Sequence, residues 1–225
     1  MKTPSPSAKP LKRPTQERAK VTVQAIFDSY VRIWQRDGWS RLTTRAVALE
    51  AGVAIGTLYD YFPSKHALHS GYVRYCVEQM LDTIDAQAVA PMALAWPERI
   101  GRLVRTLAGV EPQLPWFHPD MLELETLVAE PKHQRRVYED LLGAWHRVID
   151  AATDLPLRPS AAALEALHLS LWGGRRYAML VQLEADRMTE WAECMEQLCL
   201  RTLESNQSRS STRRYRRGPD DQEAD

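Results

Sequence analysis

Cysteine is scarce in this chain of 225 residues, and long apolar runs are missing. The three cysteines, Cys76, Cys194 and Cys199, are an odd number and sparsely placed, which excludes a disulfide framework and predicts reduced core residues without a metal site. No apolar run approaches the roughly 20 residues that a membrane-spanning helix needs. The N-terminus also lacks the apolar segment of a secretory signal. We therefore expect a cytoplasmic protein that does not associate with a membrane.

The sequence also lacks an excess of charge, with 29 Lys and Arg against 29 Asp and Glu, but this balance hides an asymmetry. Residues 1–75 carry 12 Lys and Arg against 5 Asp and Glu, whereas residues 76–225 carry 17 against 24. A basic front and an acidic back indicate that only the front faces a polyanion. Residues 1–14, rich in proline and lysine, are predicted to be a flexible basic arm that either touches DNA or is merely a leader.

The alternation typical of strands is absent, so the predicted fold is all-α. Apolar residues recur at helical spacing over 15–37, where Gly38 ends the pattern, and over 64–84, 100–107, 121–127, 137–149, 160–183 and 191–202. Gly173 and Gly174 interrupt one of these helices and weaken it by about 1 kcal/mol each, so we expect there either the close approach of another helix or a local kink. The polar residues 205–225 are predicted to be a disordered tail.

The stretch from Thr43 to Lys65 contains two short helical patterns joined by a glycine. Thr43 or Thr44 offers an N-cap hydroxyl to the first pattern, and Gly52 lets the chain leave it with a positive φ. The apolar residues of both patterns are predicted to enter a core: Val47, Ala48, Ala51, Val53, Leu58 and Phe62. Helix, glycine turn and helix form the supersecondary unit whose second member can lie in a major groove.

This stretch resembles the N-terminal domain of the TetR (tetracycline-repressor, TetR/AcrR) family of bacterial transcriptional regulators. The matching runs are Leu42-Thr43-Thr44, Ala51-Gly52-Val53, Gly56-Thr57-Leu58-Tyr59, Tyr61-Phe62 and Ser64-Lys65. The resemblance covers about residues 15–75 at motif level, and beyond them it rests on helix number and order. It implies an all-helical homodimer in which a three-helix DNA-binding domain precedes a larger ligand-binding domain, with the last two long helices pairing between subunits.

The resemblance also implies roles for particular residues. It assigns phosphate or base contacts to Thr44 and Arg45, and a phosphate contact to Lys65. Recognition-helix positions fall on Gly56, Thr57, Tyr59 and Tyr61. The chemistry agrees, because a guanidinium can read guanine, hydroxyls can bind phosphate, and a lysine at a helix N-terminus adds charge where anions already bind. Partial core packing is the alternative for the two tyrosines.

Two residues of the predicted recognition helix depart from the family pattern. Ala54 stands where many members have a polar N-cap, and Ile55 where many have a polar or charged residue. The first turn of this helix therefore carries little polar chemistry for reading bases. We expect an apolar contact between Ile55 and a thymine methyl group as the substitute.

The domain prediction is a DNA-binding domain over 15–75, with its motif at about 43–62, followed by a helical ligand-binding and dimerisation domain over 76–204. The second domain is rich in side chains that suit an apolar ligand site between helices. The candidates are Trp116, His118, Tyr138, Trp145, His168, Trp172 and Tyr177. Ordinary core packing is the alternative for each of them.

The sequence thus predicts a homodimeric, sequence-specific transcriptional regulator, a repressor released from its DNA operator by a small apolar or aromatic effector. We expect no cofactor and no enzymatic activity, because the chain has no GxSxG, HExxH or phosphate-loop pattern. The alternative is a helical protein-interaction module, or an enzyme, with a vestigial helix-turn-helix.

Overall fold

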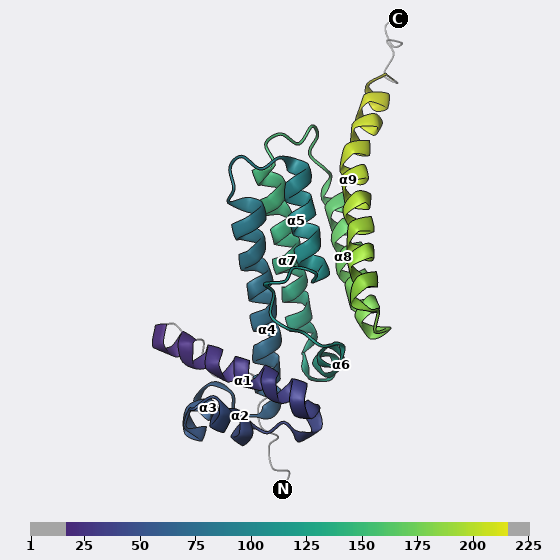
Figure 1. Ribbon diagram of the computed structural model, residues 1–225. Coiled ribbons are helices and arrows are strands. Elements are labelled where there is room, and N and C mark those ends of the chain that lie inside the picture. The colour runs from purple at the N-terminus through teal and green to yellow at the C-terminus, as the bar shows by residue number, and fades with distance from the viewer. Residues whose placement is uncertain (1–16, 216–225) are drawn as a thin grey trace, which may run out of the picture. The chain divides into compact units, whose positions relative to one another are not determined.

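The computed structural model describes residues 17–215, which form helices with no strand among them (Figure 1). In chain order they are α1 (Glu17–Arg41), α2 (Thr44–Glu50), α3 (Ile55–Tyr61), α4 (Lys65–Ile84), the π-helix η1 (Asp85–Val89), α5 (Trp96–Ala108), α6 (Pro119–Val128), α7 (Pro131–Ala151), α8 (Ala161–Leu180) and α9 (Ala185–Tyr215). The predicted all-α fold is confirmed for this part of the chain. The predicted arm at 1–14 lies outside the described residues.

The last helix is longer than the sequence predicts. The sequence predicts a disordered tail from residue 205, but the backbone of α9 is helical through Tyr215. No proline or glycine follows Gly174 until Gly218, so nothing in the sequence forces the helix to stop earlier. Residues 216–225 are outside the described part.

Contacts between Cα atoms divide the chain into two compact units. Unit 1 comprises the chain up to Glu78 together with Pro115–Gln134, and unit 2 comprises Gln79–Leu114 and the chain from Arg135 onward. The helix α4 contributes residues to both units. The connector before α6, and α6 itself, were expected in the C-terminal domain, but they cluster with unit 1 because Met121 is fully buried in its core.

The core of unit 1 contains a cluster of aromatic rings. Phe27 from α1 lies 5.5 Å from Phe62 and 5.6 Å from Tyr72 between ring centroids, and Tyr30 lies 5.0 Å from Tyr72. Large rings with 150 Å² or more of burial each let a small unit form a stable core. The buried members are Val23, Ile26, Phe27, Tyr30, Ile33, Trp34, Leu42, Val47, Ala48, Leu58, Phe62, Leu68, Tyr72, Cys76 and Met121.

Two glycines make the turns around this core. Gly38 has φ 72° inside the span of α1, so the chain breaks its helical path where the sequence predicts an end. Gly52 has φ 67° between α2 and α3, as the predicted turn requires. Both positions lie in the left-handed region, where a Cβ would be penalised.

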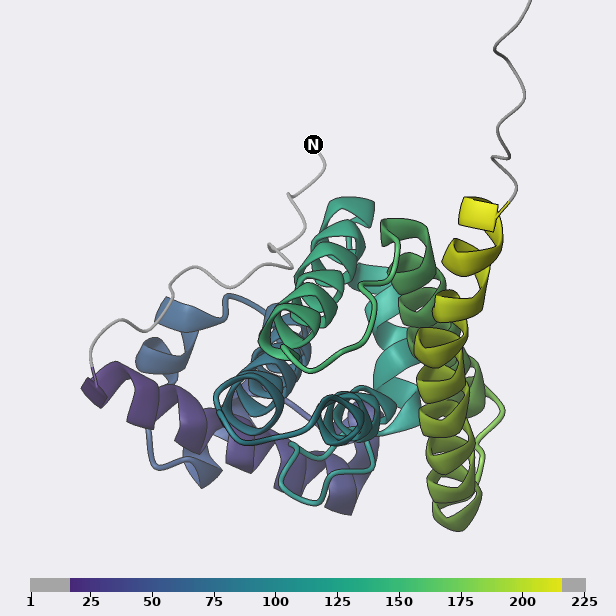
Figure 2. The same cartoon turned by 90° about the horizontal axis from the view of Figure 1, so that it is seen from above.

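In unit 2, α5 packs against η1, α8 and α9. Figure 2 shows α8 and α9 running side by side. A Cβ on Gly174 would come within 2.7 Å of the Trp191 ring of α9, so the close approach of another helix explains this glycine. Nothing in the described part of the chain lies within 4 Å of a Cβ on Gly173.

All three cysteines are free thiols. Cys76 and Cys199 are buried as predicted, but the expectation of a core position is wrong for Cys194, which is exposed on α9. Among the helices that the structure describes, none has both the length and the apolar character to cross a bilayer.

Candidate nucleic-acid interface

The helix α2 begins with a well-formed cap. Thr43 is the N-cap, and its Oγ1 accepts a hydrogen bond of 3.1 Å from the backbone N–H of Ala46. This resolves the choice between the two threonines and leaves Thr44 as the first helical residue. Such a cap stabilises a helix by about 1 kcal/mol, which matters for a helix as short as α2.

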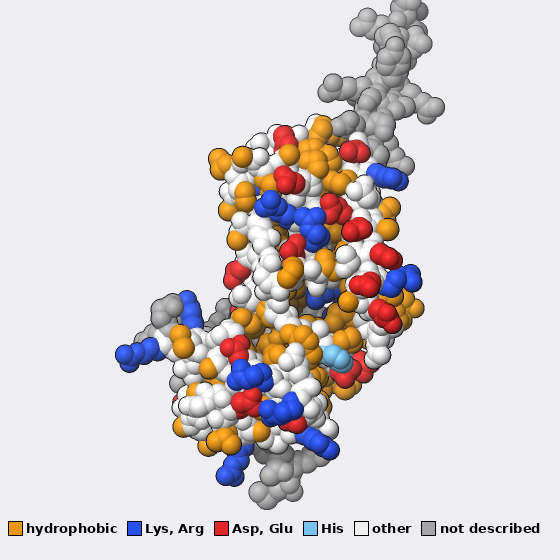
Figure 3. All heavy atoms as spheres, viewed as in Figure 1, with side chains coloured by type: hydrophobic (Ala, Val, Ile, Leu, Met, Phe, Trp, Pro, Cys, Tyr) orange, Lys and Arg blue, Asp and Glu red, His pale blue; other side chains and the backbone are white. Residues whose placement is uncertain are grey.

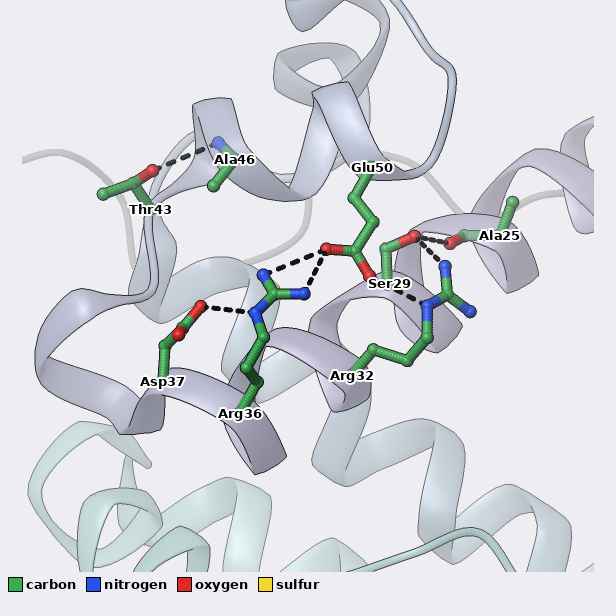
Figure 4. A network of polar contacts seen from close by, with 8 residues as sticks. All are labelled: Ala25, Ser29, Arg32, Arg36, Asp37, Thr43, Ala46 and Glu50. Carbon is green, nitrogen blue, oxygen red and sulfur yellow. Dashed lines mark hydrogen bonds and ion pairs between the residues drawn. The ribbon is translucent and has the colours of Figure 1, made fainter.

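A network of charges holds the other end of α2 against α1 (Figure 4). Glu50 accepts hydrogen bonds from Arg32 Nε at 2.8 Å and from Arg36 Nη1 and Nη2 at 3.3 Å. Arg36 also donates to Asp37, and Arg32 to the hydroxyl of Ser29. The two guanidinium groups lower the pKa of the Glu50 carboxyl, chiefly through the hydrogen bond from Arg32. The motif is thus fixed at both ends of its first helix.

Thr44 and Tyr59 connect the two helices of the motif. Their hydroxyl oxygens lie 3.1 Å apart, with Thr44 at the start of α2 and Tyr59 on α3. Both hydroxyls reach the surface, and Tyr59 is 44% exposed. A pair of adjacent hydroxyls can bind one phosphate oxygen together.

The other predicted residues of α3 differ in exposure. Ile55, Gly56 and Tyr59 are exposed, and Thr57 is half-buried. Tyr61 packs against the core of unit 1, with its ring centroid 6.2 Å from that of Phe62. The alternative of partial core packing therefore describes Tyr61 better than an outward position.

Arg45 and Lys65 differ as well. Arg45 is exposed and forms no ion pair within the described part of the chain, so its guanidinium is available to a ligand. Lys65 is half-buried; its Nζ donates to the backbone carbonyl of Trp39 and lies 3.9 Å from the centroid of the Trp39 ring. Burial lowers the pKa of this ammonium group. Trp39 therefore fixes the lysine at the N-terminus of α4.

His69 is a central residue of unit 1. It is fully buried, its Nδ1 lies 2.8 Å from the hydroxyl of Tyr30, and its ring stacks on Trp34 with centroids 5.9 Å apart. Burial lowers the pKa of His69 to about 4. The described residues contain no group of three or more His, Cys, Asp or Glu side chains that could hold a metal ion. The ring is a neutral core residue at physiological pH.

The seven predicted ligand residues are divided between the two units. Trp116 packs against the core of unit 1, and His118 caps α6 by accepting from the backbone N–H of Asp120 at 3.3 Å. In unit 2, the Tyr138 ring lies 5.1 Å from His168, and the hydroxyl of Tyr138 donates to Glu165.

The remaining members also differ in burial. Trp145 and His168 are fully buried. Trp172 is half-buried, with the guanidinium carbon of Arg175 5.2 Å from its ring centroid. Tyr177 is 69% exposed and therefore belongs to the surface of α8, away from any interior site.

Short helices joined by a glycine turn, braced by a third helix and carrying exposed hydroxyl and cationic side chains, define a helix-turn-helix protein. A family model described as "Bacterial regulatory proteins, tetR family" matches residues 26–70, which include the whole motif. Residues 26–70, and with them the helix-turn-helix, thus match this family.

Relatives and solved structures extend the comparison. The chain is 30% identical over 88 residues to the HTH-type transcriptional regulator AlkX of Mycobacterium tuberculosis, a match covering 38% of this chain and 42% of that protein. It is 31% identical over 85 residues to the nucleoid occlusion factor SlmA of Vibrio cholerae, covering 32% and 43%. The chain thus spans less than half the length of these two relatives.

The fold is shared over a longer stretch. A TetR family transcription regulator from Marinobacter aquaeolei superposes with a TM-score of 0.53 at 18% identity, covering 84% of this chain and 96% of that one. A TetR transcription regulator from Haloarcula marismortui gives 0.56 at 18% identity, covering 83% and 98%. At such identities the likeness is one of fold.

Proposed function

We propose that this protein is a sequence-specific DNA-binding transcriptional regulator that works in the cytoplasm as a homodimer. The observation that carries the proposal is the surface of the motif, where Arg45 is unpaired among the described residues and the Thr44 and Tyr59 hydroxyls are adjacent. Figure 3 shows blue Lys and Arg side chains exposed on unit 1, over the part of the chain that Figure 1 labels α1 to α3. Such a surface suits a phosphate backbone.

The direct test is a mobility-shift titration of the full chain on DNA from upstream of its own coding region. Arg45→Ala is expected to weaken binding and to reduce the salt dependence by about one ion, while the fold stays intact because the side chain is exposed. Arg136→Ala is the matched control, since Arg136 is an exposed arginine of α7 in unit 2. Equal affinity and equal salt dependence for Arg45→Ala and the parent would refute the proposal.

The dimer is proposed to form through α8 and α9. Leu169, Tyr177 and Leu180 are at least half exposed and recur with Gly173 at spacings of three and four along α8. Leu198 is similarly exposed on α9. Exposed apolar side chains on adjacent helices are typical of an association surface. Two DNA-binding units joined in this way would contact sites about one helical turn apart.

An effector site in unit 2 is part of the same proposal. Trp145 Nε1 and both ring nitrogens of His168 are buried without a hydrogen-bond partner among the described residues. Buried polar groups normally have a partner, so these nitrogens favour a small ligand that is mainly apolar but carries an oxygen. Burial lowers the pKa of His168, which keeps the ring neutral and favours an uncharged ligand.

The effector proposal can be tested by thermal shift with a panel of small aromatic and aliphatic alcohols and phenols. Trp145→Phe replaces the indole with a smaller aromatic ring and removes the N–H donor. It is expected to lose most of the shift that an oxygen-bearing compound gives to the parent. If no compound stabilises the parent, or if Trp145→Phe responds as the parent does, the assignment of this site is wrong.

Release of DNA by an effector is proposed to pass through α4 and the segment 115–134. The helix α4 carries Lys65 at one end and continues into unit 2. The segment 115–134 joins α5 to α7 in sequence, yet it packs in unit 1, where Tyr72 donates its hydroxyl to the carbonyl of Trp116. A ligand that binds one conformation of these connections better would shift the position of the motif and lower its affinity for DNA.

A further inference from the structure

The start of α3 departs from the rules that stabilise short helices. Ala54 is its N-cap and provides no side-chain hydrogen bond. The N-caps Thr43 before α2 and Ser160 before α8 both accept from a backbone N–H, and so does Ser64 just before α4. Alanine in place of such a residue typically costs about a factor of five in helix stability. The helix α5 also begins at an alanine, Ala95, without a cap bond, but it has Pro97 in its first turn. The recognition helix has neither a capping side chain nor a proline there.

The next two residues add to the departure. Ile55 is a β-branched apolar residue with 39% of its surface exposed. Gly56 lies inside the helix with no positive φ, and nothing in the described chain lies within 4 Å of where its Cβ would be. Neither the turn nor the packing therefore requires glycine. Positions that break local rules without compensation inside the fold are expected at functional surfaces.

The result is an apolar surface of backbone and small side chains, Ala54-Ile55-Gly56, which we call the apolar plate. All three residues are exposed, and in Figure 3 hydrophobic atoms are exposed at the lower left, over α3. The plate has no side-chain donor or acceptor. The two nearest hydroxyls on the same helix belong to Thr57, which is half-buried, and to Tyr59, which is paired with Thr44.

The lack of side-chain donors and acceptors limits the groups of DNA that the apolar plate can recognise. In the major groove the amino, carbonyl and ring nitrogen groups of the bases are read by hydrogen bonds, which the plate cannot form through its side chains. The 5-methyl group of thymine is the apolar feature of that groove. Glycine in the plate also lets the helix backbone approach the base edges closely.

We propose that the apolar plate recognises thymine by its 5-methyl group, with Ile55 as the contacting side chain. This inference rests on the proposed function. Hydrogen-bonded recognition of bases then falls to Arg45 on α2. The half-site therefore contains a thymine whose methyl group, and not only its base pairing, is required for binding.

The test begins with selection of duplexes from a random library by the full-length protein. Each thymine of the selected duplex is then replaced singly by deoxyuridine, which removes the methyl group and leaves every hydrogen-bonding group in place. At one position per half-site the parent protein should bind about four-fold more weakly, the effect of one buried methyl group. For the Ile55→Ala protein, the loss of affinity caused by deoxyuridine should fall below about two-fold. The substitution in the protein and the removal of the methyl group from DNA abolish the same contact.

The controls separate this inference from the proposed function. Met92→Ala truncates an apolar side chain that is 96% exposed in unit 2, and it should keep the full dependence on the methyl group. Circular dichroism and thermal melting establish that Ile55→Ala is folded. If duplexes are selected and bound but no deoxyuridine position matters, or if Ile55→Ala retains the four-fold dependence, the plate does not read thymine. If no duplex is enriched, the proposed function fails and the inference falls with it.

Discussion

Replacing Gly56 with alanine should change stability and DNA binding in opposite directions. In the free protein the added methyl group meets nothing within 4 Å, and the backbone has no positive φ. Alanine should therefore stabilise α3 by up to about 1 kcal/mol through helix propensity, which raises Tm by roughly 2–4 °C for a chain of this size. In the complex the same methyl group would stand between the helix and the base edges. Overpacking of a close interface costs about 1–3 kcal/mol, or roughly 5- to 150-fold in affinity.

The assay pairs a thermal melt with a mobility-shift titration on the same preparation. Gly143→Ala is the matched control, because Gly143 is a helical glycine of α7 whose Cβ would meet only the end of the Arg147 side chain, at 3.6 Å. It should gain stability in a similar way and bind DNA like the parent. A Gly56→Ala protein that is stabilised and binds DNA with unchanged affinity would refute the idea that this face of α3 approaches the bases closely.

Three further outcomes follow from the structure. Glu50→Gln weakens the ion pairs with Arg32 and Arg36. It should lower the free energy of unfolding by about 1 kcal/mol at low salt and by less at high salt, where the pairs are screened. Urea titrations at both salt concentrations measure the difference. The pKa of His69 is about 4 in the folded protein, against an ordinary value near 6.5. As the pH falls, the unfolded chain therefore binds the proton first, and the free energy of unfolding should decrease between pH 6.5 and 4 by about 3 kcal/mol in all. In His69→Gln much of that pH dependence should vanish, and an unchanged slope between pH 6.5 and 4 would contradict the buried neutral ring. Gly173→Ala should weaken the dimer, as measured by sedimentation equilibrium. It should not destabilise the monomer, because no atom of the described chain lies within 4 Å of the added methyl group. If the dimer dissociation constant is unchanged, Gly173 does not lie in the interface.

The sequence predicts the motif in detail because its determinants are local. The hydroxyl of Thr43, the positive φ of Gly52 and the apolar spacing of α2 and α3 each act within a few residues. The same holds for the missing cap at Ala54, which the structure confirms. Local chemistry of this kind is readable without knowing the tertiary fold.

Contacts between distant residues are not readable in this way. Glu50 lies 18 residues from Arg32, and the carbonyl of Trp39 lies 26 residues from the ammonium group of Lys65. The sequence identifies Lys65 as a cation but cannot show that Trp39 holds it in place. Likewise, Trp116 has the composition of a ligand-site residue, but tertiary packing places it in unit 1.

The contrast between Gly174 and Gly56 shows how the structure changes the reading of the motif. Both glycines lie inside a helix and weaken it. For Gly174 the reason lies inside the chain, because the Trp191 ring occupies the space that a Cβ would need. For Gly56 the described chain provides none, and the residues before it, Ala54 and Ile55, likewise give up stability without an internal gain. Since a short helix next to a tight turn can spare little stability, the compensation is best sought in a partner that approaches this face closely, which for a helix-turn-helix is the major groove of DNA.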